Sequence, residues 1–157
     1  MSSIMNKKLL NYIVRFTLTF VMIFIITEMI FTNLLSYLES FTNLGSLKYI
    51  HSFKSPILNV SPFMKIVYSI IIALILYPFY KDIIKSKRGY LKLFIILWGL
   101  ALIGSVECIP GSIEGFIYTK ISLLEHFLVA LEVTVQMMIF TLIFFKWERN
   151  VYKRSKR

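Results

Sequence analysis

The chain has 157 residues, of which 57% are hydrophobic and 16% aromatic, and it is therefore too apolar for an ordinary soluble domain of this length. Its net charge of +10 comes from basic residues beside apolar runs, which is typical of membrane anchoring, and no nucleic-acid-binding motif accompanies it. The composition favours an all-α integral membrane protein, multi-pass in the cell membrane, with a single membrane domain and no nucleic-acid partner.

The first transmembrane helix is predicted at residues 12–35, behind a short basic N-terminus. Its apolar run is too long for a secretory signal, and no small-residue cleavage site follows it. Glu28 lies in the outer half of this helix. Because a carboxylate at that depth is rare and costly in hydrocarbon, Glu28 is a candidate for an ion site or a helix contact.

A mixed outer loop is expected at residues 36–61, where apolar residues at helical spacing favour an interfacial amphipathic helix. The second span follows at residues 62–80. Pro78 lies near the far end of this span and predicts a kink or an early stop, because proline cannot continue regular helix hydrogen bonding. Lys65, near the start, is expected to extend outward to the membrane interface.

A tight basic cytoplasmic turn is predicted at residues 81–89, followed by a third span at residues 90–109 with Glu107 at its outer end. The turn and the basic tail at residues 146–157 are expected to orient the chain and to contact anionic lipid headgroups. The candidates for this lipid contact are Lys85, Lys87, Arg88, Lys153 and Arg154.

The fourth span is predicted at residues 122–145, and it carries Glu125, His126, Glu132 and Gln136. Glu125, Glu132 and Gln136 fall within about 40° of one another on a helix that turns about 100° per residue. They form one polar stripe, which is expected to face protein or water and not lipid. The preceding outer loop, residues 110–121, is either a plain connector or a lid over this stripe.

Glu132 lies close to the middle of the fourth span, and no Lys or Arg is expected to reach it there. It is therefore expected to be protonated, to bind a cation, or to form hydrogen bonds with polar groups such as Gln136. A neutral Glu132 would join helices, whereas a Glu132 that exchanges protons would serve transport. Both readings of this residue stay open.

The adjacent pair Glu125 and His126 suggests a metal or catalytic site, but neighbouring residues on a helix point about 100° apart. The H-E-x-x-H motif is absent and the chain has only two histidines, so neither a metal site nor a cofactor is expected. An intramembrane acid/base enzyme that uses Glu107, Glu125, His126 and Glu132 is the least favoured reading.

The distribution of basic residues predicts the orientation of the four spans. The N-terminus, the middle turn and the C-terminus alternate correctly with both termini in the cytoplasm, and they carry most of the 18 Lys and Arg residues. The four exceptions, assigned to the outer side, are Lys48, Lys54, Lys65 and Lys120.

These features predict a small polytopic membrane protein without catalytic activity, acting as a subunit, regulator or protective partner in a membrane complex. The alternative is an oligomeric proton or cation transporter or channel that uses the intramembrane glutamates, since four short helices rarely enclose a pathway alone. The expected partners are the lipid bilayer and either further copies of the chain or another membrane protein.

Overall fold

The computed structural model describes residues 2–35, 61–103, 111–118 and 123–154, and within these residues the chain is all-helical, without strands. Three stretches are long and apolar enough to cross a membrane, namely Lys7–Phe31, Phe63–Lys85 and His126–Arg154. A fourth apolar helix, Gly89–Leu102, is shorter. The prediction of an all-helical chain with long apolar helices is confirmed for this part of the protein.

Helix α1, Ser2–Leu35, begins ten residues before the predicted start of the first span. The extra residues contain neither glycine nor proline, so nothing in them interrupts helical hydrogen bonding. Most of the outer loop predicted at residues 36–61, including its interfacial helix, lies outside the described residues.

The second span contains the irregularity that Pro78 predicts. Helix α3, Ser61–Leu76, ends two residues before the proline, and a 3-10 turn, η3, covers Tyr77–Phe79. Helix α4, Tyr80–Lys85, then resumes the α-helical geometry. Residues 81–85, placed by the sequence in the basic turn, are therefore helical, because a proline interrupts a helix only locally.

The turn between α4 and α5, Gly89–Leu102, is consequently short and depends on Gly89. A Cβ atom on Gly89 would lie 1.8 Å from the carbonyl oxygen of Ile83 and 2.6 Å from the ring of Phe145. Only glycine allows the chain to reverse this closely against α4 and α7.

Two further helices follow, α6 at Ile113–Tyr118 and α7 at Leu123–Arg154. Helix α6 lies in the segment predicted as the second outer loop. Helix α7 continues nine residues beyond the predicted end of the fourth span, so most of the basic tail is helical.

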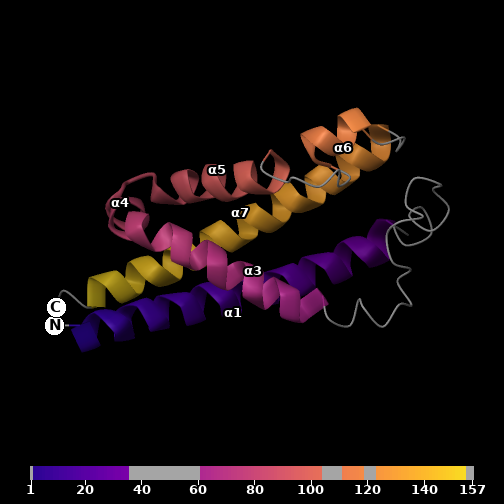
Figure 1. Ribbon diagram of the computed structural model, residues 1–157. Helices are drawn as coiled ribbons and strands as arrows, with labels where there is room; N and C mark the ends of the chain where they lie inside the picture. Colours follow the sequence, from indigo (N-terminus) through magenta and orange to yellow (C-terminus); the bar gives the residue numbers. More distant parts are fainter. Residues whose placement is uncertain (1, 36–60, 104–110, 119–122, 155–157) are drawn as a thin grey trace.

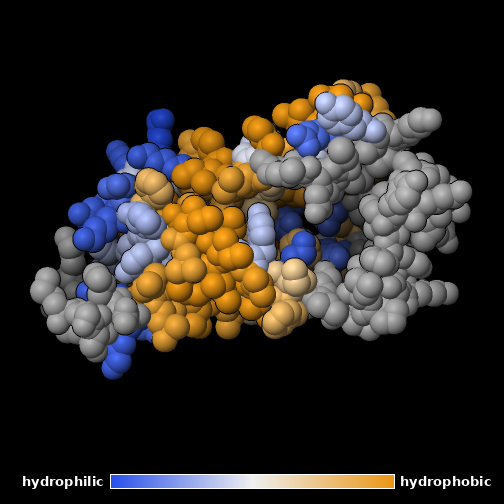
Figure 2. Space-filling model, in the orientation of Figure 1, coloured by the Kyte–Doolittle hydropathy of each residue, from blue (hydrophilic) through white to orange (hydrophobic). Residues whose placement is uncertain are grey.

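Helices α1 and α7 run in opposite directions, and the two termini lie at the same end of the molecule (Figure 1). Helix α1 packs against both α3 and α7, while α5 packs along α7. A broad hydrophobic band covers the middle of the face in Figure 2, and hydrophilic residues gather at the end that holds the termini.

Aromatic side chains from α1 and α7 form the centre of the core. The ring of Phe16 lies 4.9 Å from that of Phe140 and 5.0 Å from that of Phe144, both edge to face. Phe20 extends the cluster, with its ring 5.4 Å from that of Phe140. All four side chains are buried. Edge-to-face pairs at these separations stabilise packing beyond the area they bury.

Candidate functional site

Charged side chains from different helices meet in two clusters, one on each side of the aromatic core. We name the first, Arg15, Tyr80 and Glu148, the Glu148 cluster. The second, Glu28, Lys65 and Glu132, is named the Lys65 cluster.

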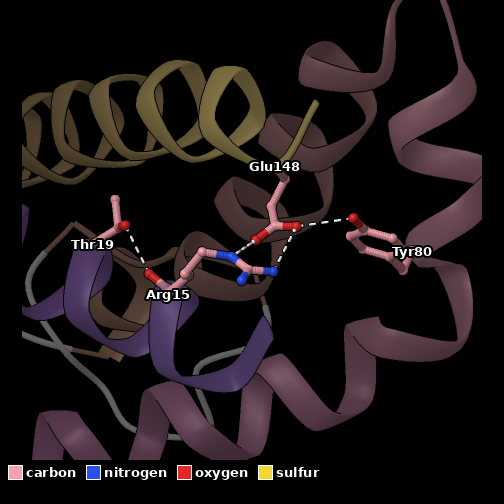
Figure 3. A network of polar contacts seen from close by, with 4 residues as sticks. All are labelled: Arg15, Thr19, Tyr80 and Glu148. Atoms are coloured by element: carbon pink, nitrogen blue, oxygen red, sulfur yellow. Dashed lines mark hydrogen bonds and ion pairs between the residues drawn. The ribbon is translucent and has the colours of Figure 1, made fainter. Parts of the chain in front are cut away.

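The Glu148 cluster ties three helices together at the end of the molecule that holds the termini (Figure 3). Glu148 on α7 is fully buried and forms an ion pair with Arg15 on α1. The Arg15 guanidinium donates from Nε to Oε1 of Glu148 and from Nη2 to Oε2 across 3.2 Å. The hydroxyl of Tyr80, at the start of α4, donates to the same Oε2 across 2.9 Å. Every bond to the carboxylate is thus charge-assisted, which makes the junction strong.

Sequence reasoning missed this cluster, because it placed Arg15 and Glu148 in cytoplasmic segments by position alone. One signal was present in the spacing of α7. Phe140, Phe144 and Glu148 follow one another at intervals of four residues, which places them on one face of a helix. An acid on the face of a buried aromatic pair needs a partner, since an unpaired buried charge is costly.

The Lys65 cluster joins α1, α3 and α7 on the other side of the aromatic core. The Lys65 ammonium lies 3.9 Å from the centre of the Phe24 ring, a cation–π contact with α1. Glu28 lies one helical turn after Phe24 on α1. Glu132 lies one turn before Gln136, which bonds to Thr27 next to Glu28. Both carboxyl groups therefore belong to the same region as the ammonium and interact with it electrostatically. Glu28 is exposed, whereas Lys65 and Glu132 are half-buried.

Sequence reasoning did not relate Lys65 to Glu132. Lys65 is near the start of α3, which packs on α1, and its four-carbon stem carries the ammonium over the Phe24 ring. Lys65 consequently contacts α1 from its position near the start of the candidate span Phe63–Lys85.

Gln136, the last residue of the predicted stripe, is buried and connects α7 to α1. Its Nε2 donates to Oγ1 of Thr27 across 2.9 Å, and Thr27 donates in turn to the carbonyl oxygen of Ile23 across 2.8 Å. This part of the stripe faces protein. The side chain of Glu125 lies outside the described residues, as does Glu107.

His126 has a structural environment. Its buried ring accepts a hydrogen bond at Nδ1 from the backbone N–H of Gly111 across 3.0 Å, and the Phe116 ring lies 5.7 Å away in an edge-to-face arrangement. Gly111 has φ of 86°, a conformation that favours glycine. His126 therefore fastens the segment that leads into α6 onto α7.

The basic lipid-contact candidates lie at the end of the molecule that holds the termini. Helix α4 contacts α7, so the turn after α4 and the last turn of α7 belong to the same end (Figure 1). All five of these side chains are exposed, namely Lys85, Lys87, Arg88, Lys153 and Arg154.

The arrangement of these groups suits binding and helix association. Among the described residues, no group of three or more His, Cys, Asp or Glu side chains is placed to hold a metal ion. The Glu148 carboxylate is fully buried and accepts hydrogen bonds from Arg15 and Tyr80, whereas the Glu28 carboxylate of the Lys65 cluster is exposed. No family model, no curated protein and no solved structure matches this chain.

Proposed function

We propose that the chain is a four-span protein of the cell membrane with both termini in the cytoplasm. It has no catalytic activity and acts as a subunit, regulator or protective partner within a membrane complex. Three long apolar helices and a shorter one, α5, support this arrangement. The basic residues gathered at one end support the orientation, because such residues are retained on the cytoplasmic side.

The observation that supports a non-conducting role is the aromatic core between the two polar clusters. Gln136 and Glu148 are twelve residues apart on α7, or about 18 Å along the helix axis. Buried Phe16 fills this interval together with Phe140 and Phe144, and its ring meets each of theirs edge to face. The packing between these two polar residues is therefore dominated by aromatic rings, which supports a role without ion conduction through a single copy of the chain.

Ion flux in proteoliposomes tests this proposal directly. The purified chain is reconstituted at a known copy number, and proton and potassium flux are followed under an imposed gradient. We expect rates equal to those of protein-free vesicles. Association is measured in parallel by cross-linking in intact membranes and by the mass of the complex in mild detergent, where we expect a stable assembly with another membrane protein.

The exposed carboxylate of Glu28 favours a second candidate, an oligomeric proton or cation transporter. In such an assembly Glu28 and Glu132 from several copies would line a shared pathway, and the aromatic core of each copy would form its wall. Flux that depends on Glu132, from a homo-oligomer of defined size, would support this candidate and overturn the first.

A further inference from the structure

The three charged groups of the Lys65 cluster lie close to the ends of the candidate spans. Glu28 is three residues before the end of Lys7–Phe31, and Lys65 is two residues after the start of Phe63–Lys85. Glu132 is six residues after the start of His126–Arg154. At a rise of about 1.5 Å per residue, the cluster is about 3–9 Å inside the apolar segments, where lipid headgroups meet acyl chains.

The cluster carries both signs of charge and is accessible. Two carboxyl groups and one ammonium give it a formal charge of −1, and Glu28 is exposed on the surface of α1. Charged groups at this depth need water, protein or a polar headgroup over them, because hydrocarbon does not solvate them.

Exposed apolar or aromatic side chains adjoin the cluster on the same two helices. Ile25 on α1 lies about 60° around its helix from Glu28, and Tyr68 on α3 lies about 60° from Lys65. A ligand that fits all of these features has a short polar head with a positive and a negative group and an apolar tail beneath it.

We propose that the Lys65 cluster binds the headgroup of a phospholipid that carries a phosphate and a primary amine, as in phosphatidylethanolamine. The ammonium of the headgroup donates hydrogen bonds to Glu28 and Glu132, and the phosphate accepts hydrogen bonds from Lys65. The acyl chains lie against the exposed side chains of Ile25 on α1 and Tyr68 on α3. This inference rests on the membrane placement proposed above and adds a lipid ligand to it.

The chemistry of the cluster sets a selectivity. A primary ammonium donates up to three hydrogen bonds to carboxylates, whereas the quaternary ammonium of phosphatidylcholine donates none. An anionic headgroup such as that of phosphatidylglycerol lacks the cation and is repelled by the net charge of the cluster. The expected order of affinity is therefore phosphatidylethanolamine, then phosphatidylcholine, then phosphatidylglycerol.

The test is a titration of the purified full-length chain in mild detergent with short-chain forms of these three lipids. Native mass spectrometry measures the bound lipid, and thermal unfolding measures the stabilisation by ligand. Free O-phosphoethanolamine is titrated in a parallel arm. Binding of the lipid at far lower concentrations than the free compound identifies a membrane lipid as the ligand, and equal affinities identify the soluble headgroup compound.

The variants Glu28→Gln and Glu132→Gln should each weaken phosphatidylethanolamine binding about tenfold, as expected for the loss of a charge-assisted hydrogen bond. The matched control is Glu114→Gln on α6, which makes the same change away from the cluster and should leave binding unchanged. Because Glu28 is exposed, its substitution leaves the packing intact. If Glu132→Gln fails to fold, the Glu28→Gln variant still tests lipid binding by the cluster.

Equal binding of the three lipids, or wild-type affinity in the Glu28→Gln variant, would overturn the inference. It would also be overturned if no lipid bound and the chain instead self-associated in a manner that required Glu28. Alkaline carbonate extraction of native membranes is run alongside. Retention in the membrane pellet without lipid selectivity would reject this inference alone, whereas release into the supernatant would reject the membrane placement itself.

Discussion

Arg15 and Glu148 are 133 residues apart in the sequence and form the ion pair that joins the first and last helices of the fold. Glu148 is fully buried, and Arg15 retains 19% of its side-chain exposure. Because Tyr80 also donates to Glu148, this junction holds α4 in place as well. It explains how helices with largely apolar contacts acquire one fixed arrangement.

Removal of either charge alone should be costly. Arg15→Met leaves the buried Glu148 carboxylate without its cation, and we expect a loss of about 3 kcal/mol in the free energy of unfolding. The double variant Arg15→Met with Glu148→Leu should recover most of this loss, because no charge then remains buried. Thermal unfolding in detergent measures the effect. Lys85→Met is the control, because the Lys85 side chain on α4 is exposed. If the double variant instead lost the sum of the two single losses in free energy of unfolding, the ion pair would be contradicted.

The hydrogen bond between Gln136 and Thr27 should make a smaller contribution. Interhelical hydrogen bonds within membranes contribute about 0.6 kcal/mol on average, so Gln136→Leu and Thr27→Val should each destabilise the chain modestly. A double-mutant cycle should give a coupling of that size. Thr19→Val is the matched control, since Thr19 is also buried on α1 but bonds only to the carbonyl of Arg15 in its own helix. If Thr19→Val lost more stability than Thr27→Val, the interhelical hydrogen bond from Gln136 to Thr27 would be excluded as the cause of the destabilisation.

Gly89→Ala should be the most damaging small substitution in the chain. The added methyl carbon would lie 1.8 Å from a backbone oxygen, which cannot move without displacing α4. Overpacking of a core costs about 1–3 kcal/mol, and a clash with backbone belongs at the upper end of that range or above it. Expression level and thermal unfolding report the result. Gly99→Ala, where no atom lies within 4 Å of the added carbon, is the control and should be neutral.

The proposed topology predicts where reporter fusions will be located. Fusions after Lys87 and Arg157 should report the cytoplasm, and fusions after Lys54 and Tyr118 should report the outside. Basic residues near span ends set this orientation. Neutral replacement of Lys85, Lys87 and Arg88 should weaken topology or expression. A cytoplasmic signal from the Lys54 fusion would contradict the four-span arrangement.

Hydropathy was sufficient to predict the long helices, because an apolar run of about 20 residues has few other stable conformations in a membrane. It was not sufficient to predict the partners of the charged residues. Arg15 and Glu148 were assigned to cytoplasmic segments, and Lys65 to the interface, because sequence position gives depth and not the rotation of one helix against another. The contact between Lys65 and Phe24 depends on how α3 lies on α1, which no local pattern encodes. Pro78 shows the converse, since its effect is local and was predicted.

Glu132 provides the last prediction, and it separates helix association from ion handling. Glu132→Gln keeps the shape and hydrogen-bonding ability of the side chain but removes its capacity to ionise. If Glu132 serves association, the Gln variant should retain fold and assembly, whereas Glu132→Leu should weaken helix association by about 0.5–2 kcal/mol. If Glu132 carries protons or cations, the Gln variant should fold normally and abolish flux.

Variants of Lys65 extend this experiment. Lys65→Gln removes the cation that interacts with Glu132 and Glu28, so the two carboxyl groups lose this shared counter-charge. We expect this variant to be less stable than wild type and to be partly restored by Glu132→Gln in the same chain, because the second change removes the repulsion. Thermal unfolding and proteoliposome flux are measured for the wild type, Lys65→Gln, Glu132→Gln and the double variant. The same two assays are applied to Glu132→Leu. Wild-type behaviour of Glu132→Leu in both assays would show that Glu132 contributes to neither role, and the Lys65 cluster would then lose its place as the candidate functional site.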